Sequence, residues 1–240
     1  MTSSTTTIAL RWSAIRARVD EACARAGRAP GEVTLVAVSK THPASALREA
    51  VAAGAVDLGE NYAQELADKR RELADLAGVR WHYIGRLQRN KAKLVAGHVA
   101  LVHAVDSREL AEELGKRTIA LGAAAVHPSQ PVLLAINLGA EASKGGVAAN
   151  DAVGLAREVA RVGGVRLDGL MTLPPPADDP EASRPHFLAL RALRDRIADE
   201  LGQPLPVLSM GMSDDFEVAI ACGATHVRVG TAIFGSRARG

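Results

Sequence analysis

Short runs of apolar, mostly β-branched residues recur along the whole chain, and longer segments with helical spacing separate most of them. Several runs are continuously apolar, which is typical of parallel strands that are covered on both faces. The runs begin about 28 residues apart on average, close to the length of one βαβ step. We predict eight strands, over residues 33–38, 55–59, 80–85, 99–105, 131–137, 165–171, 206–210 and 226–230.

The segments between the runs carry the spacing and end signals of helices. A first helix is predicted before the first strand, over 13–26, with Ser13 as its N-cap. Further helices are predicted over 44–54, 107–122 and 187–202, each of which ends at a glycine. Strands that alternate with helices in this way build a parallel sheet.

Eight strand–helix units in 240 residues predict an α/β fold, a single closed (β/α)8 TIM-like barrel with an extra N-terminal helix. The alternative is an open doubly wound sheet, which usually has a glycine-rich turn after its first strand. Here the first strand is followed by SKTHP at 39–43 instead. We therefore favour the barrel, with residues 1–9 as a disordered tail and residues 10–240 as a single domain.

Composition and charge narrow the class of protein. Hydrophobic residues make up 48% and charged residues 23% of the chain, which excludes global disorder. The net charge of +2 is too balanced to indicate a nucleic-acid-binding or anionic-membrane surface. Cys23 and Cys222 are far apart, so we expect neither a disulfide framework nor a metal site built on cysteines. Because no signal-peptide or membrane-span pattern is visible, we expect a cytoplasmic protein.

In a (β/α)8 barrel the reactive groups lie where the strands end, because the loops that follow them meet at that face. The first predicted strand leads into Lys40, which has the same alternation as Val36 and Val38. If these valines face into the barrel, so does Lys40, and a desolvated lysine can attack a carbonyl to form a Schiff base. The competing interpretation is a lysine that extends from the strand end to solvent.

Anion-binding features follow the last two predicted strands, which is where phosphate often binds in these barrels. Ser209 and Gly211 lie at the end of one strand, and Gly230 and Thr231 at the end of the other. Small residues of this kind expose backbone amides and hydroxyl donors to an anion. The alternative is a pair of ordinary turns that contain glycine.

An arginine in the last predicted strand adds a third feature. Arg228 alternates with Val227 and Val229, so it faces the barrel interior if the valines face the helices. A buried guanidinium needs an acceptor, and this acceptor is either a ligand or a carboxylate across the barrel mouth, Glu60 or Asp106.

A lysine, a phosphate cradle and an inward arginine together indicate a phosphorylated aldehyde, and pyridoxal 5′-phosphate (PLP) fits all three. Lys40 would then form the Schiff base and Arg228 would meet the pyridine nitrogen. A cationic partner keeps this nitrogen unprotonated, which makes the ring a poorer electron sink than one paired with a carboxylate.

Ten segments, in this order, resemble the pyridoxal phosphate homeostasis proteins (the YggS/PROSC, or PLPBP, family), which share the barrel fold of the alanine racemase N-terminal domain. The resemblance covers about residues 10–237. It implies a PLP-binding protein in which Lys40 is the PLP lysine and Asn61 and Met171 line the cofactor. Arg86 is a departure, since a smaller or neutral residue, often His, is usual there. The segments are LVAVSK at 35–40, GENY at 59–62, WHYIG at 81–85, LQRNK at 87–91, VDS at 105–107, IN at 136–137, KGG at 144–146, GLM at 169–171, LSMGMSD at 208–214 and RVGTAIFG at 228–235.

The resemblance implies a non-catalytic protein that holds PLP as a Schiff base in intracellular PLP homeostasis, with PLP-requiring apoenzymes as further partners. The alternative is a Schiff-base enzyme, either an amino-acid racemase or a lysine aldolase. We find no convincing substrate-carboxylate site or second acid/base, and we interpret Tyr62 and Tyr83 as barrel packing. We therefore predict no catalytic residues. A barrel without the racemase dimer domain also favours a monomer.

Three further groups of residues leave two interpretations each. Lys144 is either a second amine that helps to load or release PLP, or a surface loop lysine. A basic cluster is more simply a solvated helix start than a nucleic-acid patch, and His82 and His103 lack ligand spacing, so we predict no metal. The basic cluster consists of Arg86, Arg89, Lys91 and Lys93.

Overall fold

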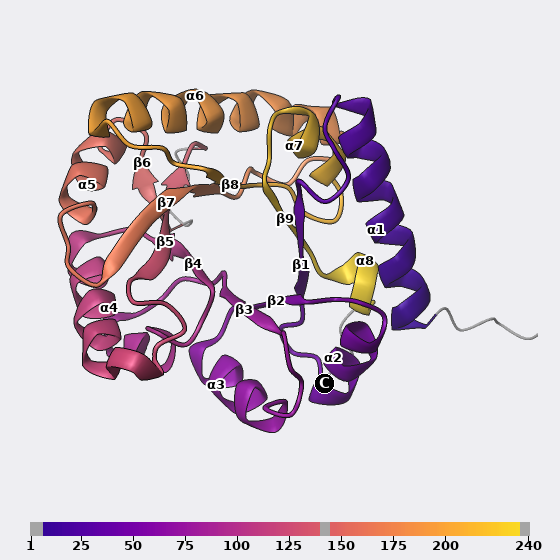
Figure 1. The fold of residues 1–240 in the computed structure, drawn as a ribbon. Helices are drawn as coiled ribbons and strands as arrows, with labels where there is room; N and C mark the ends of the chain where they lie inside the picture. The colour runs from indigo at the N-terminus through magenta and orange to yellow at the C-terminus, as the bar shows by residue number, and fades with distance from the viewer. Residues whose placement is uncertain (1–6, 140–144, 236–240) are drawn as a thin grey trace, which may run out of the picture.

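The structure is a computed structural model that describes residues 7–139 and 145–235. Eight parallel strands form a closed ring in the order β4-β3-β2-β1-β9-β8-β7-β5, and β4 pairs with β5 to close it (Figure 1). This closure confirms the predicted barrel, and the alternative of an open doubly wound sheet is wrong. The strands are β1 (Thr34–Val38), β2 (Asp57–Glu60), β3 (Arg80–Tyr83), β4 (Leu101–Val105), β5 (Gln130–Asn137), β7 (Val165–Thr172), β8 (Val207–Ser209) and β9 (His226–Val229).

Each of the eight predicted runs overlaps one of these strands. A ninth strand, β6 (Val147–Ala148), pairs with the end of β5 outside the ring. It is not predicted, because two residues are too few to form a hydrophobic pattern.

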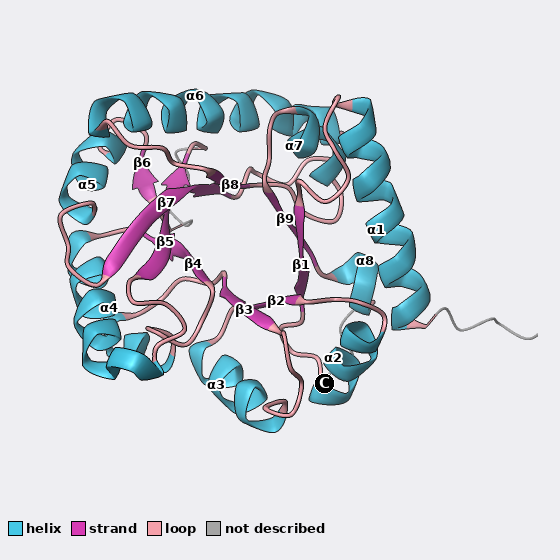
Figure 2. Cartoon of the chain, in the orientation of Figure 1, coloured by secondary structure: helices cyan, strands magenta, loops and turns pink. Residues whose placement is uncertain are grey.

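The helices form an outer layer around the strands (Figure 2). The predicted helices over 44–54, 107–122 and 187–202 are all present, and each ends within two residues of its predicted glycine. The helices are α1 (Ile8–Arg25), α2 (Ala44–Ala52), α3 (Ala63–Glu72), α4 (Arg108–Leu121), α5 (Ala152–Val159), α6 (Arg184–Leu201), α7 (Phe216–Ala221) and α8 (Thr231–Phe234), with short 3-10 turns η1 (Arg89–Leu94), η2 (Gly122–Ala124) and η3 (Pro180–Ser183).

The first helix begins earlier than the sequence pattern predicts. Its N-cap is Thr7, whose hydroxyl accepts a hydrogen bond from the Leu10 amide, and not Ser13. Residues 8 and 9, which were predicted as part of the disordered tail, are therefore helical. The physical reason is that Ile8 packs against the core, so the helix gains apolar burial from its first residue.

The core has two parts. The main part lies between the strands and the helices, and Leu35 and Ala37 of β1 belong to it. A small second cluster contains Leu101, Leu133 and Met171 from β4, β5 and β7. The inner cluster is small because several other positions that face the centre of the barrel are polar, and these form the site described below.

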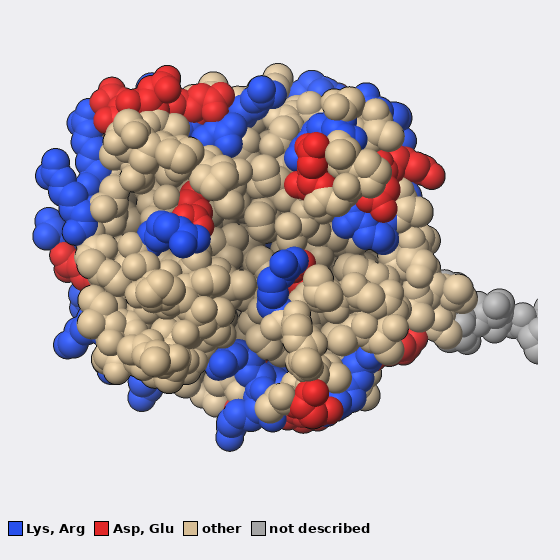
Figure 3. All heavy atoms as spheres, viewed as in Figure 1, with Lys and Arg blue, Asp and Glu red and all other residues tan. Residues whose placement is uncertain are grey.

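The molecular surface carries mixed charge. On the face drawn in Figure 3, lysine and arginine side chains lie next to aspartate and glutamate side chains. Among the described residues, no helix is long and apolar enough to cross a membrane.

Candidate functional site

Lys40 lies two residues after the end of β1, at the carboxyl end of the barrel, and is half-buried. Leu35 and Ala37 belong to the core cluster between strands and helices, whereas Val36 and Val38 are buried but do not belong to it. The alternation of β1 is therefore the predicted one, with the two valines on the opposite face from the helices. This register brings Lys40 to the end of the barrel where the reactive groups of such folds lie.

The backbone on both sides of Lys40 is held from α3. The Lys69 ammonium donates to the carbonyl oxygen of Ser39 at 2.7 Å, and Glu65 Oε1 accepts a hydrogen bond from the Thr41 amide at 2.6 Å. Lys69 also donates to Glu65 and to the buried Glu60, at 2.7 Å each. Burial raises the pKa of Glu60, against the lowering effect of Lys69.

Thr41 itself has a φ of 67°, which is rare for a β-branched residue. Such strain persists only where surrounding contacts enforce it, and it is common at functional sites. The sequence pattern did not identify Lys69 and Glu65. The available signal was their i,i+4 spacing on the helix that follows GENY.

The loops after β8 and β9, which carry the residues predicted to bind phosphate, contact each other. The Arg228 amide donates to the Gly211 carbonyl at 3.0 Å, and the Thr231 hydroxyl donates to Ser213 Oγ at 3.2 Å. Gly211 has a φ of 92°, and a Cβ there would lie 2.6 Å from Ala219 Cβ, so only glycine fits. Gly230 directly precedes Thr231 at the start of α8.

Arg228 is buried in the barrel interior, with 4% of its surface exposed. Its Nη1 donates to Ser209 Oγ at 2.5 Å and its Nη2 donates to the Thr172 carbonyl at 2.9 Å. In the described part of the chain no carboxylate lies within ion-pair distance of Arg228. Burial lowers the pKa of the guanidinium to about 10, against the raising effect of the more distant Asp215. The alternative of a salt bridge to Glu60 or Asp106 is therefore wrong. Those two carboxylates pair with other residues, Lys69 and Arg86.

Ser209 accepts the hydrogen bond from Arg228 Nη1. Its hydroxyl is fully buried and hydrogen-bonds to both Arg228 and His103, with 2.8 Å between Ser209 Oγ and His103 Nδ1. The sequence pattern groups Ser209 with the phosphate-binding residues, but its side chain is engaged with Arg228. His103 and His82 are core histidines that join this interior network, with 3.0 Å between His103 Nε2 and His82 Nδ1.

The two residues assigned by resemblance lie on opposite sides of the barrel mouth. Met171, at the end of β7, is buried in the inner cluster. Asn61 follows β2 and is half-buried. The loop after β3 crosses close to Asn61 because it carries Gly85, where a Cβ would lie 2.1 Å from the Asn61 carbonyl oxygen.

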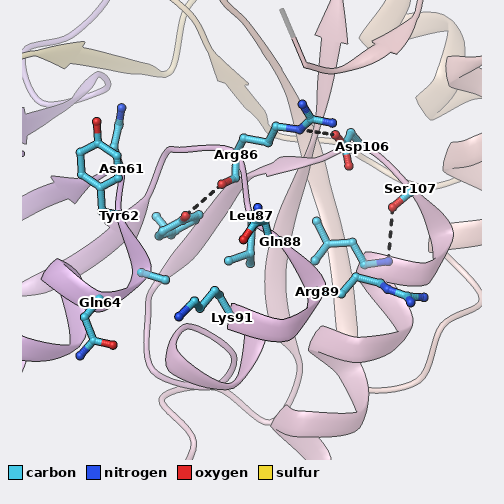
Figure 4. Close-up of a pocket in the computed structure, with 13 residues that line it drawn as sticks. Asn61, Tyr62, Gln64, Arg86, Leu87, Gln88, Arg89, Lys91, Asp106 and Ser107 are labelled. Carbon is cyan, nitrogen blue, oxygen red and sulfur yellow. Dashed lines mark hydrogen bonds and ion pairs between the residues drawn. The ribbon is translucent and has the colours of Figure 1, made fainter.

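A cavity of about 710 Å³ opens beside Asn61, between the ends of β2, β3 and β4 (Figure 4). Asn61 is the one predicted cofactor-binding residue that lines it. Arg86 reaches across its rim, with its Nε 3.9 Å from Asp106 Oδ2 and 77% of its side chain exposed. Arg89 and Lys91 of η1 also border the cavity, so most of the predicted basic cluster lies there.

Tyr62 corrects one sequence-based interpretation. Tyr83 is buried in the core, as predicted, whereas Tyr62 is 56% exposed and lines the cavity. The physical reason is that Tyr62 lies in the turn that leads into α3, beyond the end of β2, where its side chain is not covered by the helix. Lys144 lies outside the described residues. Within the described residues no group of three or more His, Cys, Asp or Glu side chains is arranged to hold a metal ion.

The barrel and its polar interior define the class of protein. Residues 10–238 match the family of the alanine racemase N-terminal domain, so the chain belongs to that family. A solved alanine racemase from Corynebacterium glutamicum has the same fold, with a TM-score of 0.70 at 19% identity. The similarity covers 94% of this chain and 62% of that racemase chain.

More similar relatives define a narrower group. The pyridoxal phosphate homeostasis protein of Pseudomonas aeruginosa is 46% identical over 231 residues, 96% of each chain. The one from Aquifex aeolicus is 44% identical over 227 residues, 95% of this chain and 97% of its own. PipY from Synechococcus elongatus, solved with PLP bound, is 35% identical with a TM-score of 0.83, covering 95% of this chain and all of PipY. The chain belongs to the family of pyridoxal phosphate homeostasis proteins, which confirms the resemblance seen in its motifs.

Proposed function

We propose that this protein binds PLP inside the barrel mouth and acts as a carrier in PLP homeostasis, not as an enzyme. The observation that carries the proposal is Arg228, a buried cation held between two neutral acceptors. Asp215 favours the charged guanidinium from beyond ion-pair distance but does not offset the effect of burial, and a ligand acceptor would add to this compensation. The solved structure of the PipY relative with PLP bound supports the choice of ligand.

Lys40 would hold the aldehyde end of the ligand. The Lys40 amine is the group that would hold PLP covalently, because an amine can condense with an aldehyde with loss of one water molecule. The hydrogen bonds from Lys69 and Glu65 to the backbone on either side of Lys40 fix the position from which the Lys40 side chain extends.

The other end of the ligand carries a phosphate. We assign this phosphate to the paired loops after β8 and β9, with Gly211, Gly230 and the Thr231 hydroxyl, and we assign the Ser209 hydroxyl to the support of Arg228. Met171 and Asn61 would line the ring. Arg86, Arg89 and Lys91 at the rim of the cavity would attract the dianionic phosphate as the ligand approaches.

The character of the site favours storage over turnover. Bound PLP supplies an aldehyde and an electron-accepting ring. A guanidinium beside the ring nitrogen keeps this nitrogen unprotonated and makes the ring a weak electron sink. We propose that the loaded protein is a monomer and transfers PLP to PLP-requiring apoenzymes.

One observation favours a second candidate function. The phenol of Tyr62 is exposed at the barrel mouth beside Asn61, where an acid/base group of a Schiff-base enzyme would be useful. An amino-acid racemase or aldolase reaction that is lost in Tyr62→Phe would establish this function.

The test loads the purified protein with PLP and removes the excess by gel filtration. It then measures bound PLP, the transfer of PLP to a PLP-requiring apoenzyme, amino-acid racemisation and retro-aldol cleavage. We expect about one PLP per chain, reactivation of the apoenzyme and no turnover above a Lys40→Ala control. Turnover that depends on Lys40 would contradict the carrier function. Absence of bound PLP would contradict both the carrier and a PLP-dependent enzyme, and would leave an aldolase in which Lys40 reacts with the substrate carbonyl directly.

A further inference from the structure

A continuous chain of buried hydrogen bonds crosses the barrel from its strand-start end to Arg228. His82 Nε2 lies 2.9 Å from Asp57 Oδ1, and His82 Nδ1 lies 3.0 Å from His103 Nε2. His103 Nδ1 lies 2.8 Å from Ser209 Oγ, which accepts from Arg228. The strands β4 and β8 are not neighbours in the sheet, so the contact between His103 and Ser209 must pass through the barrel interior.

The two ends of this chain have fixed roles. The Arg228 guanidinium can only donate. Asp57 lies beside Arg80, whose guanidinium binds both carboxylate oxygens at 2.6–2.7 Å. Burial raises the pKa of Asp57, but the hydrogen bonds from His82 and Arg80 more than offset this and lower it to about 2. Near neutral pH, Asp57 is therefore a carboxylate that can only accept.

With each imidazole carrying a single proton, these ends assign every proton between them. His82 must carry a proton on Nε2 to donate to Asp57, so in the neutral ring its Nδ1 is an acceptor. His103 must then carry its proton on Nε2, which leaves its Nδ1 to accept the Ser209 hydroxyl proton. The Ser209 oxygen thus presents a lone pair to Arg228.

The surroundings of His103 keep it neutral. It is fully buried, and Ser209 on β8, His82 on β3, and His226 and Arg228 on β9 surround it. Burial and these three basic neighbours lower the pKa of His103 well below its ordinary value. Hydrogen bonds that run in the opposite direction, from His82 through His103 to Ser209, would need one additional proton on His82. The Ser209 oxygen would then receive hydrogen bonds from both Arg228 and His103.

We propose that Asp57, His82 and His103 are positioning residues that orient the Ser209 hydroxyl so that its oxygen accepts from Arg228 and holds the guanidinium at the cofactor end of the barrel. The role of that end rests on the proposed function. The proton arrangement itself does not, since it follows from the protein alone. Asp57 thus acts on the site from the opposite mouth, where it lines a cavity of about 240 Å³ together with Arg80 and His82.

The first test needs no PLP. Long-range ¹H–¹⁵N NMR of the ligand-free protein at neutral pH distinguishes a protonated imidazole nitrogen from a bare one. We expect both His82 and His103 to carry their proton on Nε2 and to have a bare Nδ1. A proton on Nδ1 of either histidine would reverse the chain and overturn the proposal.

The second test measures the PLP dissociation constant by equilibrium dialysis for Asp57→Asn and for a matched control, Asp168→Asn. Asp168 forms the same two-pronged ion pair, with Arg166, and lines the same cavity, but its hydrogen bonds with Arg166 do not connect it to the histidines. We expect Asp57→Asn to weaken binding about tenfold and the control to stay within about twofold.

A Ser209→Ala background separates positioning from general damage to the fold. If Asp57 acts through Ser209, Asp57→Asn has no additional effect on PLP affinity in that background. An unchanged tenfold loss there would overturn the proposal, as would equal losses for Asp57→Asn and Asp168→Asn. If the wild-type protein does not bind PLP, the proposed function fails, while the NMR result still decides the proton arrangement.

Discussion

Replacing Arg228 by methionine separates the contribution of this residue to binding from its contribution to stability. Burial lowers the pKa of Arg228 from 12.5 to about 10, which corresponds to about 3 kcal/mol of unfavourable free energy for the charged form. Methionine removes this cost and fills much of the same volume. It also removes hydrogen bonds to Ser209 and Thr172, each worth about 1.5–3 kcal/mol with a charged donor. The contributions largely cancel, so we expect the free energy of unfolding to change by less than about 3 kcal/mol.

Binding should respond differently, because the hydrogen bond to the ligand has no compensating gain. Losing one charge-assisted hydrogen bond of about 1.5–3 kcal/mol weakens PLP binding by about 10- to 100-fold. Urea unfolding of the ligand-free protein and equilibrium dialysis with PLP measure the two quantities. The control is Arg194→Met, which also removes a hydrogen bond to a carbonyl, that of Leu205, but on the outer layer. An Arg228→Met protein with wild-type affinity would refute the placement of the cofactor.

Three further predictions concern the frame of the site. The pKa of Asp57 is lowered from 3.8 to about 2, so its ionised form should contribute about 2 kcal/mol of stability above about pH 4, which is lost as the pH falls towards 2. Urea unfolding at a series of acidic pH values should show this loss, and the Asp57→Asn variant should not. Gly211→Ala should destabilise the protein by about 2–4 kcal/mol. The control Gly202→Ala should cost only about 1 kcal/mol, because φ is also positive there but no atom lies within 4 Å of the new Cβ. Equal losses of stability in thermal unfolding would contradict the steric reason. Thr41→Gly should relieve the backbone strain at φ 67° and stabilise the protein by up to about 1 kcal/mol, while weakening PLP binding. Tighter PLP binding in equilibrium dialysis would contradict a role for this strain in placing Lys40.

The sequence predicts the barrel well because burial on both faces leaves a direct trace in the chain. The run at 131–137 is apolar throughout apart from its last residue, and β5 is buried along nearly its whole length. Features at strand ends, such as Arg228 and the Gly211 loop, are also visible, since they depend on local alternation and on small residues.

Contacts that depend on closure of the ring are not visible in the sequence. Ser209 and His103 are 106 residues apart, and nothing local to either indicates a partner across the barrel. The hydrogen bond from Lys69 to the Ser39 carbonyl is hidden for a related reason, because it depends on how α3 packs against the end of β1. Tyr62 follows a predicted strand among mostly polar residues and Tyr83 lies within one, and the structure shows that only Tyr83 is buried in the core.

The most direct test of the central claim is the position of the covalent bond to PLP. Borohydride reduction of the protein loaded with one equivalent of PLP fixes the Schiff base, and peptide mass spectrometry then locates the modified lysine. We expect the phosphopyridoxyl group on Lys40 and a loss of the label in Lys40→Ala. A label located mainly on another lysine, such as Lys144, or no label on the wild-type protein, would contradict the placement of PLP at the end of β1.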